Sequence, residues 1–564
     1  MKVLRRLGFL VLASGMALAQ TNSPNNPTVS DQIKALQDSI TRQQKMIEDL
    51  QKELAEQKKA PAPQVVNAAL TVPSSNTPEA QADAAKPKDS PLSFRIGGTD
   101  WTPGGFMDFN NIFRTVNTGN VVSTGFGAIP FNNTTAGQLT EFRSTGQYSR
   151  WNMKVGGKYG ETTLTGYLEG DFNGNDAANV FATTNPHTLR LRLYYLNAKH
   201  GIWEFTAGQA WGLITPNKVG VGPFGADLAT TQSTDGNIHV GVPYARDGQF
   251  RVAIHPNDKF SWAVSVENPQ QVTNGEVLAP TNATANLSLG GQLGGQLDGI
   301  ATPGVPNAFP DVVTKLAYDS KLGSRALHVE AGGLITSVKL TVQATPTGAG
   351  IPFQKHSKIG SGGMAGLNFE LMKNIRFMAY GNYGTGIGRY FNALGPQYVV
   401  VPVNAPGTIC TAAGGCDVNI SMVRTANGYG GIETQLGSKT QIAAYYGGTY
   451  YQRNSFPDIS SNVVLAPTAL VSCSIGQAAQ NKPCIGFGGT NSANSNNRSI
   501  QEGSFVITQT LWKNPQFGAL LFINDASYST RAPWFITRNA AGALTNPKNA
   551  HMFMDHVVLR YVLP

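Results

Sequence analysis

The last residues of the chain alternate between two kinds of side chain over a longer stretch than a turn would produce. Apolar Val557, Leu559 and Tyr561 occupy one parity, and the opposite parity carries His556 and Arg560. A period of two is the period of a β-strand, whose side chains point alternately to opposite faces. Lipid on one face and an aqueous interior on the other explain both the apolar stripe and the arginine. The same pattern recurs along most of the chain, so it predicts an all-β protein.

The N-terminus has the composition of a secretory signal peptide. Three cations within the first six residues precede an apolar stretch over 7–17, and Ala-Leu-Ala at 17–19 forms a small-x-small cleavage site. A membrane anchor is the alternative interpretation, but an apolar stretch this short does not cross about 30 Å of hydrocarbon. We therefore expect residues 1–19 to be a signal peptide that directs export of the chain.

The composition is low in charge and rich in glycine. Charged residues make up 14% of the chain, whereas soluble domains usually have about a quarter, so the composition favours strands that face lipid. The formal net charge is +9, but no cluster of Lys and Arg with interleaved aromatic residues indicates a nucleic-acid partner. A basic pore that favours anions fits this charge better.

Four cysteines in an exported chain predict disulfide bonds, and four cysteines allow three connectivities. Pairing within each local loop is favoured, which corresponds to Cys410–Cys416 and Cys473–Cys484. A metal site is the alternative interpretation. The spacings contain no CxxC and no histidine lies nearby, so we expect neither a metal site nor a cofactor.

Two segments of different composition separate the signal peptide from the first strand. Residues 20–59 have an isoleucine or leucine at every seventh position from Ile33 to Leu54, which predicts a short coiled-coil helix that associates chains. A solitary amphipathic helix is the alternative. Residues 60–93 are rich in Pro, Ala and Ser, which predicts an extended linker without a core.

Residues 94–564 form the largest segment, in which period-two stretches alternate with turns. Sixteen candidate strands lie near 105–114, 148–156, 161–172, 187–198, 201–209, 248–255, 259–267, 311–319, 324–338, 357–371, 374–384, 424–437, 439–450, 498–512, 516–528 and 549–563. Tight turns and long loops alternate between them, as in outer-membrane barrels with periplasmic turns and external loops. We therefore predict a 16-stranded antiparallel transmembrane β-barrel porin domain, preceded by a periplasmic coiled-coil helix.

The order of coiled coil, linker and barrel resembles the DcaP-like trimeric outer-membrane porins of Gram-negative bacteria. The resemblance is carried by SRWNMKVGGKYGETTLTGYLEGDF at 149–172, LRLRLYYLNAKHGIWEFTAGQAWGL at 189–213 and YGTGIGRY at 383–390. It implies a homotrimer in the outer membrane, an N-terminal segment in the periplasm and small carboxylates, including dicarboxylates, as solutes. The phosphate-selective porins share this layout and are the nearest competing family. Such barrels usually end in an aromatic residue, whereas this chain ends in Leu-Pro.

Charged side chains on three successive strands share one parity. A charge that faces lipid at the middle of a membrane costs about 2–4 kcal/mol, so this parity is expected to face the lumen. The residues expected to form a pore constriction that contacts solute are Arg150, Lys154, Glu169, Asp171, Arg190 and Arg192. The opposite parity is expected to carry Leu189, Leu191, Leu193 and Tyr195 towards lipid. Two interpretations stay open: ion pairs that only complete a polar wall, and a basic cluster that attracts anions.

Residues 210–247 follow the fifth strand, the position of the loop that folds inward in many sixteen-stranded porins. We expect this loop to form an eyelet, with Asp227, Asp235, His239 and Arg246 as the candidate lining residues. Other residues of lumen parity are Asp108, Arg114, Arg251, Arg376 and Arg560. Two of them, Arg376 and Arg560, lie near tight turns, where a position at the rim is an equal alternative.

The motifs GxSxG, HExxH and a Gly-rich phosphate loop before a helix do not occur, so we expect no enzymatic activity. The sequence predicts a porin for passive uptake of small anionic solutes, in contact with outer-membrane lipid and with copies of itself. A phosphate- or sugar-selective porin is the alternative within transport. A plugged structural barrel, tethered to the periplasm by its coiled coil, is the alternative outside transport.

Overall fold

The computed structural model describes Lys45, which is helical, and the chain from Ser90 to Pro564 with gaps. The gaps are 120–121, 123, 175–187, 225–227, 229–238, 244, 269–286, 292–308, 345–353, 392–394, 403–417, 458–472, 474–483, 490–495, 537–538 and 540. The predicted signal peptide, nearly all of the predicted coiled coil, the predicted linker up to residue 89, and Cys410, Cys416, Asp227 and Asp235 lie outside the described residues. The barrel belongs to the compact unit Pro73–Pro564.

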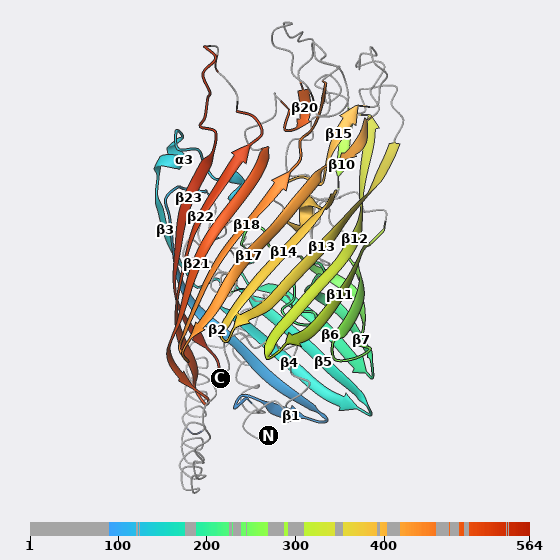
Figure 1. Cartoon of the computed structure of the whole chain (residues 1–564), viewed down its shortest axis with the longest axis vertical. Coiled ribbons are helices and arrows are strands. Elements are labelled where there is room, and N and C mark those ends of the chain that lie inside the picture. The colour runs from blue at the N-terminus through green and yellow to red at the C-terminus, as the bar shows by residue number, and fades with distance from the viewer. Residues whose placement is uncertain are drawn as a thin grey trace, which may run out of the picture. The chain divides into compact units, whose positions relative to one another are not determined.

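Sixteen antiparallel strands form a closed β-barrel (Figure 1). They are β2 (Thr99–Arg114), β4 (Arg150–Tyr159), β5 (Thr162–Asp171), β6 (Arg190–His200), β7 (Trp203–Trp211), β8 (Arg246–Ile254), β9 (Phe260–Glu267), β11 (Asp311–Leu322), β12 (Arg325–Ala344), β13 (Gln354–Met372), β14 (Ile375–Thr385), β17 (Arg424–Leu436), β18 (Thr440–Tyr451), β21 (Asn497–Asn514), β22 (Gly518–Pro533) and β23 (Ala550–Val562). Each strand pairs with the next, and β23 pairs with β2 to close the ring. Every one overlaps a strand predicted from the sequence, so the predicted barrel is confirmed.

The connections between the wall strands differ in length at the two ends of the barrel. Turns of two to five residues join β4 to β5, β6 to β7, β8 to β9, β11 to β12, β13 to β14, β17 to β18 and β21 to β22. Figure 1 shows these turns at the lower end of the barrel, and the strand ends that the longer connections join at the upper end. The lower end is called the turn end below, and the upper end the loop end.

Several short elements add to the wall. Strands β1 (Phe94–Ile96) and β3 (Glu141–Thr145) pair with β2, and β10 (Leu287–Gly291) pairs with β12. Two hairpins stand apart from the main sheet, β15 (Tyr398–Pro402) with β16 (Val418–Met422), and β19 (Asn454–Pro457) with β20 (Cys484–Phe487). A disulfide joins Cys473 to Cys484, the pairing expected for these two cysteines. Strands of three to five residues are too short to show a sequence period, so the sequence did not predict them.

The wall strands carry apolar side chains outward and polar side chains inward. On β2, Met107 and Phe109 are exposed, whereas Asp108 and Asn110 beside them are buried inside. On β23, Leu559 is exposed outside in the same way. The outward apolar face matches a lipid environment, and hydrogen bonding between all neighbouring wall strands satisfies the backbone there.

Strand β2 has different neighbours along its length, and Gly105 lies where they change. Its residues up to Phe106 pair with β4, and its residues from Phe106 onward pair with β23. Gly105 has φ +134°, and a Cβ at this position would collide with the carbonyl oxygen of Arg150. Its own carbonyl accepts the N–H of Leu563 at 3.0 Å. The closure of the barrel therefore requires glycine at this position.

We predict that Gly105→Ala weakens the barrel at its seam. The substitution combines an unfavourable backbone conformation, which costs about 1–3 kcal/mol, with a steric collision. The temperature at which the folded band disappears in heat-modifiability gels should fall, and the yield of folded protein in detergent should drop. Gly98→Ala is the matched control, because a Cβ at Gly98 meets nothing within 4 Å. Equal thermal shifts in the two variants would contradict this role of Gly105.

Candidate functional site

Strands β4, β5 and β6 bring five charged side chains together inside the barrel. Arg190 donates to both oxygens of Asp171, from Nε at 2.9 Å and from Nη2 at 2.5 Å. Arg192 donates from Nε to Glu169 Oε1 at 2.7 Å and from Nη1 to Asp171 Oδ2 at 3.0 Å. Arg150 Nε lies 3.6 Å from Glu169 Oε1. The lumen residues predicted on these strands, apart from Lys154, thus form one connected group, called the basic cluster below.

A β-bulge on β6 makes this double pairing possible. Glu169 pairs with Leu193 and Gly170 with Leu191, so Arg192 is an extra residue without an opposite partner on β5. The bulge places Arg190 and Arg192 close to the same carboxylate, and it reverses the parity of the strand beyond it. The prediction that Leu193 and Tyr195 face lipid is therefore wrong, because both are buried inside. Leu191, which precedes the bulge, faces outward as predicted. Alternation in the sequence alone does not reveal a bulge.

Two of the three arginines in the basic cluster are more exposed to water than its two carboxylates. The side chains of Glu169 and Asp171 are 7% and 1% exposed, and that of Arg192 is 2% exposed. Arg150 and Arg190 retain 20% and 25%. The carboxylates are therefore covered by their arginines, and water in the lumen meets guanidinium groups. Lys154, two inward positions further along β4, is also partly exposed, and the described residues contain no ion-pair partner for it.

Arg246 extends the basic cluster on its far side. It is the first residue of β8 rather than part of the preceding loop, and its guanidinium lies 5.3 Å from the centre of the Trp211 ring. It is within electrostatic range of Arg190 and Asp171. Four arginines thus face two carboxylates in this region, which leaves an excess of positive charge.

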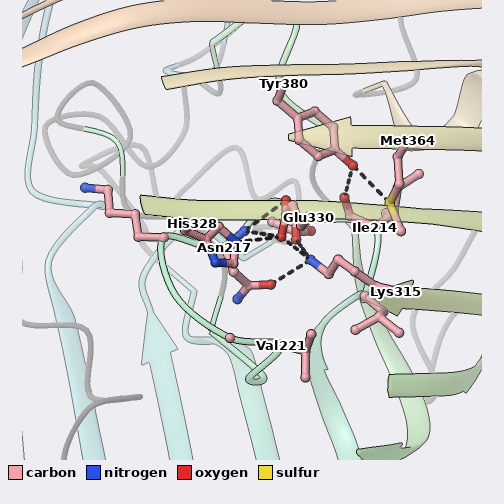
Figure 2. Close-up of polar contacts among 12 residues, drawn as sticks. Ile214, Asn217, Val221, Lys315, His328, Glu330, Met364 and Tyr380 are labelled. Carbon is pink, nitrogen blue, oxygen red and sulfur yellow. Dashed lines mark hydrogen bonds and ion pairs between the residues drawn. The ribbon is translucent and has the colours of Figure 1, made fainter. Parts of the chain in front are cut away.

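The segment that follows β7 crosses the interior and is fastened to the opposite wall. The ammonium of Lys315, on β11, donates to the carbonyl of Thr215 at 2.8 Å and to Asn217 Oδ1 at 2.7 Å, and it lies 3.1 Å from Glu330 on β12. Figure 2 shows Lys315, Asn217, His328 and Glu330 converging on one another. The described part of residues 210–247, called the inward loop below, thus takes the inward course expected from the sequence.

Further contacts hold the described parts of the inward loop. The Tyr380 hydroxyl donates to the carbonyl of Ile214 at 2.6 Å (Figure 2), and Lys218 Nζ lies 3.2 Å from Glu433 Oε2. The last part of the loop lies against β17 and β18, where Asn427 donates to the carbonyl of Gly241 at 2.7 Å. A Cβ on Gly447 would collide with the backbone of the loop, so glycine permits this close approach.

The inward loop covers one side of the interior more than the other. Inward residues of β11 such as Val313 and Lys315 are fully buried beneath it. The inward face of β4 instead keeps intermediate exposure from Arg150 to Gly156. Among the described residues, the side of the interior that keeps contact with water is therefore the side that carries the basic cluster.

Not every predicted site residue is in contact with water in the interior. His239 is buried, with its Nδ1 2.7 Å from the carbonyl oxygen of Val240, and burial lowers the pKa of His239 to about 4. The expectation that His239 lines an eyelet is therefore wrong, since the imidazole is neutral and covered. Asp108 and Arg560 form a two-point ion pair, with 2.6 and 2.7 Å between their atoms, across the seam of β2 and β23.

The remaining predicted lumen residues also have structural contacts. Arg114 pairs with Glu141 at 2.6 Å, in the part of the wall that β3 extends. Arg251 donates to the carbonyls of Val221 and Trp211 at 3.0 and 2.6 Å and so positions the inward loop. Arg376 lies inward on β14 and is partly exposed near the turn end.

The sequence did not single out a second charged group near the loop end. Asp247 and Asp311 lie beside Arg389, which contacts both and stacks its guanidinium on Tyr390 at 3.9 Å. Arg389 belongs to the 3-10 helix η3 (Gly388–Tyr390), in a connection that turns into the barrel. The sequence placed Asp311 at the start of a predicted strand and Asp247 at the end of the predicted loop 210–247. It did not bring the two together, because their common partner comes from another loop. Among the described residues, no group of three or more His, Cys, Asp or Glu has the arrangement of a metal site.

The closed barrel, its apolar outer face and its inward loop define the fold of an outer-membrane porin. The solved structure of the outer membrane channel DcaP of Acinetobacter baumannii is similar to this chain, with a TM-score of 0.51 and 14% identity over 84% of this chain and 100% of that chain. The resemblance to DcaP-like porins is thus confirmed at the level of the fold. The solved structures that are similar to this chain are channels and porins rather than enzymes.

Other porins match less closely. An anion-selective porin from Comamonas acidovorans aligns with a TM-score of 0.40 and 9% identity over 82% of this chain and 100% of that chain. OmpT of Vibrio cholerae aligns with a TM-score of 0.38 and 9% identity over 83% of this chain and 99% of that chain. No protein-family model and no curated protein matches the sequence. In the part of the chain that the structure describes, no helix is long and apolar enough to span a membrane.

We predict that Lys315→Met loosens the inward loop. The variant removes the ammonium that joins the loop to β12 and leaves Glu330 as a buried charge, and breaking a buried ion pair costs about 3–5 kcal/mol. Single-channel recordings in planar bilayers should show a larger conductance and stronger current fluctuations than the wild-type protein. Lys355→Met, at an exposed position of β13, is the control and should leave the trace unchanged. A Lys315 variant that folds and conducts like the wild type would contradict the fastening role.

Proposed function

We propose that the protein is an outer-membrane porin that lets small anionic solutes, such as carboxylates and dicarboxylates, pass passively. The observation that supports anion preference is the difference in exposure within the basic cluster. Guanidinium groups of Arg150 and Arg190 reach the water-accessible path, while Glu169 and Asp171 are covered beneath them. A narrow passage with low-dielectric walls strengthens the field of such charges, which favours anions over cations.

Within this proposal the acids have a positioning role. Glu169 and Asp171 receive hydrogen bonds from Arg190 and Arg192, which hold the guanidinium planes against the wall. The cluster then presents ordered hydrogen-bond donors to a passing carboxylate. The planar guanidinium group matches the geometry of a carboxylate well. The choice of carboxylates comes from the resemblance to DcaP-like porins. A phosphate- or sugar-selective porin remains the alternative solute class, and a silent barrel tethered to the periplasm is the structural alternative.

A polar patch on the outer face supports self-association. Asn524 on β22 donates to Asp555 on β23 at 2.6 Å, and Ser144 on β3 donates to Asn111 on β2 at 2.7 Å. All four side chains lie on the parity that faces away from the lumen, on neighbouring strands. Hydrocarbon offers no hydrogen-bond partners and a lipid-facing charge is destabilising, so a protein surface fits this patch better.

The surroundings of the polar patch fit a contact with another copy of the chain. Large exposed side chains border it, among them Phe109, Phe142 and Tyr528, and aromatic residues are enriched at protein interfaces. The coiled coil predicted for residues 20–59 independently favours association of chains. We propose a homotrimer, with the number three taken from the family resemblance and the turn end facing the periplasm.

We predict that Arg150→Ala combined with Arg190→Ala shifts the selectivity of the channel towards cations. The double variant removes the two cations of the cluster that retain exposure and leaves Glu169 and Asp171 in place. The reversal potential under a KCl gradient in planar bilayers should move towards the potassium equilibrium potential, with the effect largest at low salt. Lys355→Gln, on the outer parity of β13, is the control.

Three outcomes separate the alternatives. An anion-selective wild type that loses its preference in the double variant would support the proposal. A wild type that prefers cations would contradict the assignment of selectivity but keep the pore. A folded wild type that shows no conductance would favour the structural barrel.

We predict that Asp555→Ala weakens self-association. If a partner chain covers the polar patch, removing the carboxylate takes away hydrogen-bonding capacity at the interface, and native mass spectrometry in detergent should show more free monomer. If lipid covers the patch, the same substitution should stabilise the barrel and leave its oligomeric state unchanged, which would contradict the interface. Ser361→Ala, on the outer face of β13, is the control.

A further inference from the structure

Three arginines and two aromatic rings gather at the loop end of the barrel, around the ends of β17, β18, β21 and β22. Arg424 is the first residue of β17, Arg453 follows the last residue of β18 by two positions, and Arg498 is the second residue of β21. Tyr450 belongs to β18, and Trp534 follows β22 directly. These five residues are called the outer arginine patch below.

The outer arginine patch continues the lipid-facing side of these strands to their loop ends. Arg424 is exposed and shares its parity with Ile432, which is exposed on the outer face, whereas Thr425 beside it is buried inside. Tyr450 is 42% exposed, and its neighbour Tyr451 is fully buried. Arg424 and Tyr450 therefore point away from the lumen, so the patch is separate from the basic cluster.

The indole of Trp534 holds the outer arginine patch together. Its N–H donates to the carbonyl of Tyr451 at 3.0 Å, and its ring meets the ring of Tyr450 edge-on at 6.1 Å. The guanidinium groups of Arg453 and Arg498 each lie 5.9 Å from the centre of the Trp534 ring. Cations are attracted to aromatic faces at this distance, so the ring orders both guanidinium groups while they keep their charge.

Two features of the backbone place these arginines. The pairing of β21 with β22 shifts between Asn497 and Ser499, which leaves Arg498 as an extra residue without an opposite partner. Such a bulge redirects a side chain, and that of Arg498 is exposed. Gly488, just beyond β20, has φ +72°, and a Cβ there would lie 2.8 Å from Cγ of Arg453. Glycine thus permits the stem of Arg453 to pack closely against the chain after β20.

The outer arginine patch carries positive charge at the level expected for lipid headgroups. Among the described residues, no ion pair involves Arg424 or Arg498. A charged side chain on the lipid face destabilises a barrel at the middle of the membrane and is tolerated near the membrane surface. Rings with a polar atom, such as those of Tyr450 and Trp534, concentrate at that surface as well. The patch therefore fits a partner with negative charge at the boundary between hydrocarbon and water.

We propose that the outer arginine patch binds a phosphorylated glycolipid of the outer leaflet. A guanidinium group matches phosphate with paired hydrogen bonds. Arg453 and Arg498 contact one phosphate. Arg424 lies on the other side of β18, two strand spacings or about 10 Å from β21, and contacts a second phosphate on the same headgroup. This inference rests on the proposed orientation, with the turn end facing the periplasm, and it adds a lipid on the outside of the barrel rather than a solute inside it.

Diphosphoryl and monophosphoryl lipid A are suitable probes, because they differ by one phosphate on the same glycolipid. The full-length protein in nonionic detergent is titrated with each lipid, and native mass spectrometry measures the fraction of protein that carries it. Half-saturation of the wild type should need at least fivefold less of the diphosphoryl lipid. Sodium pyrophosphate, added in tenfold excess over the lipid, tests whether a soluble phosphate is sufficient, and it should leave the lipid bound.

The decisive variant is Arg453→Gln combined with Arg498→Gln. It should raise the concentration of diphosphoryl lipid A for half-saturation about tenfold. Lys355→Gln is the matched control, because Lys355 is also an exposed cation near the loop end, on β13, and it should bind like the wild type. Arg498→Gln alone changes a single exposed side chain, and its smaller loss of affinity guards against a misfolded double variant.

Three results would overturn this inference. The first is equal affinity for the two lipids, and the second is unchanged affinity in both arginine variants. The third is release of the lipid by pyrophosphate, which would indicate a site for soluble anions. None of these measurements depends on conduction. Absent or cation-selective conductance in KCl would refute the proposed function and leave the result for the lipid site as it stands.

Discussion

The hydrogen-bonding demand of the backbone in hydrocarbon is the constraint on which the rest of the structure depends. A strand surrounded by lipid must pair on both edges, so the sheet has to close, and closure is made where β23 meets β2. The seam has its own specialisations, including Gly105 with φ +134° and the ion pair of Asp108 with Arg560. Once the ring is closed, every side chain points either to lipid or to the interior, and the parity of each strand separates the two environments.

The interior combines an apolar cluster, in which Leu213 and Ile214 of the inward loop pack with residues of the wall such as Met378, with buried ion pairs. Lys315 with Glu330, and Lys218 with Glu433, fasten the inward loop to the wall. Burying such pairs has a large desolvation cost, so they contribute little net stability, but losing one partner is expensive. They are thus suited to define the course of a loop. Because the loop covers β11 more than β4, it also determines which charged side chains remain in contact with water.

The distribution of charge at the basic cluster follows from which side of the interior the inward loop covers. Two carboxylates lie beneath a layer of arginines, and the arginines keep the contact with the lumen. Under the proposed function, a cluster of the same composition with the acids exposed would favour cations instead. Exposure, and not only the number of charges, therefore decides what the passage attracts.

The sequence by itself determined the wall: the alternation along sixteen strands, the tight turns between them and the parity of Arg150, Glu169, Asp171 and Arg190 could all be predicted, because a period of two is a local property. It did not determine the bulge at Arg192, which reversed the parity of Leu193 and Tyr195, since a bulge depends on pairing with β5. Nor did it indicate Lys315, Glu330 or Arg389, whose partners come from segments distant in the chain. Which charges remain exposed was decided only by the tertiary structure, because exposure depends on the path of the inward loop across the barrel.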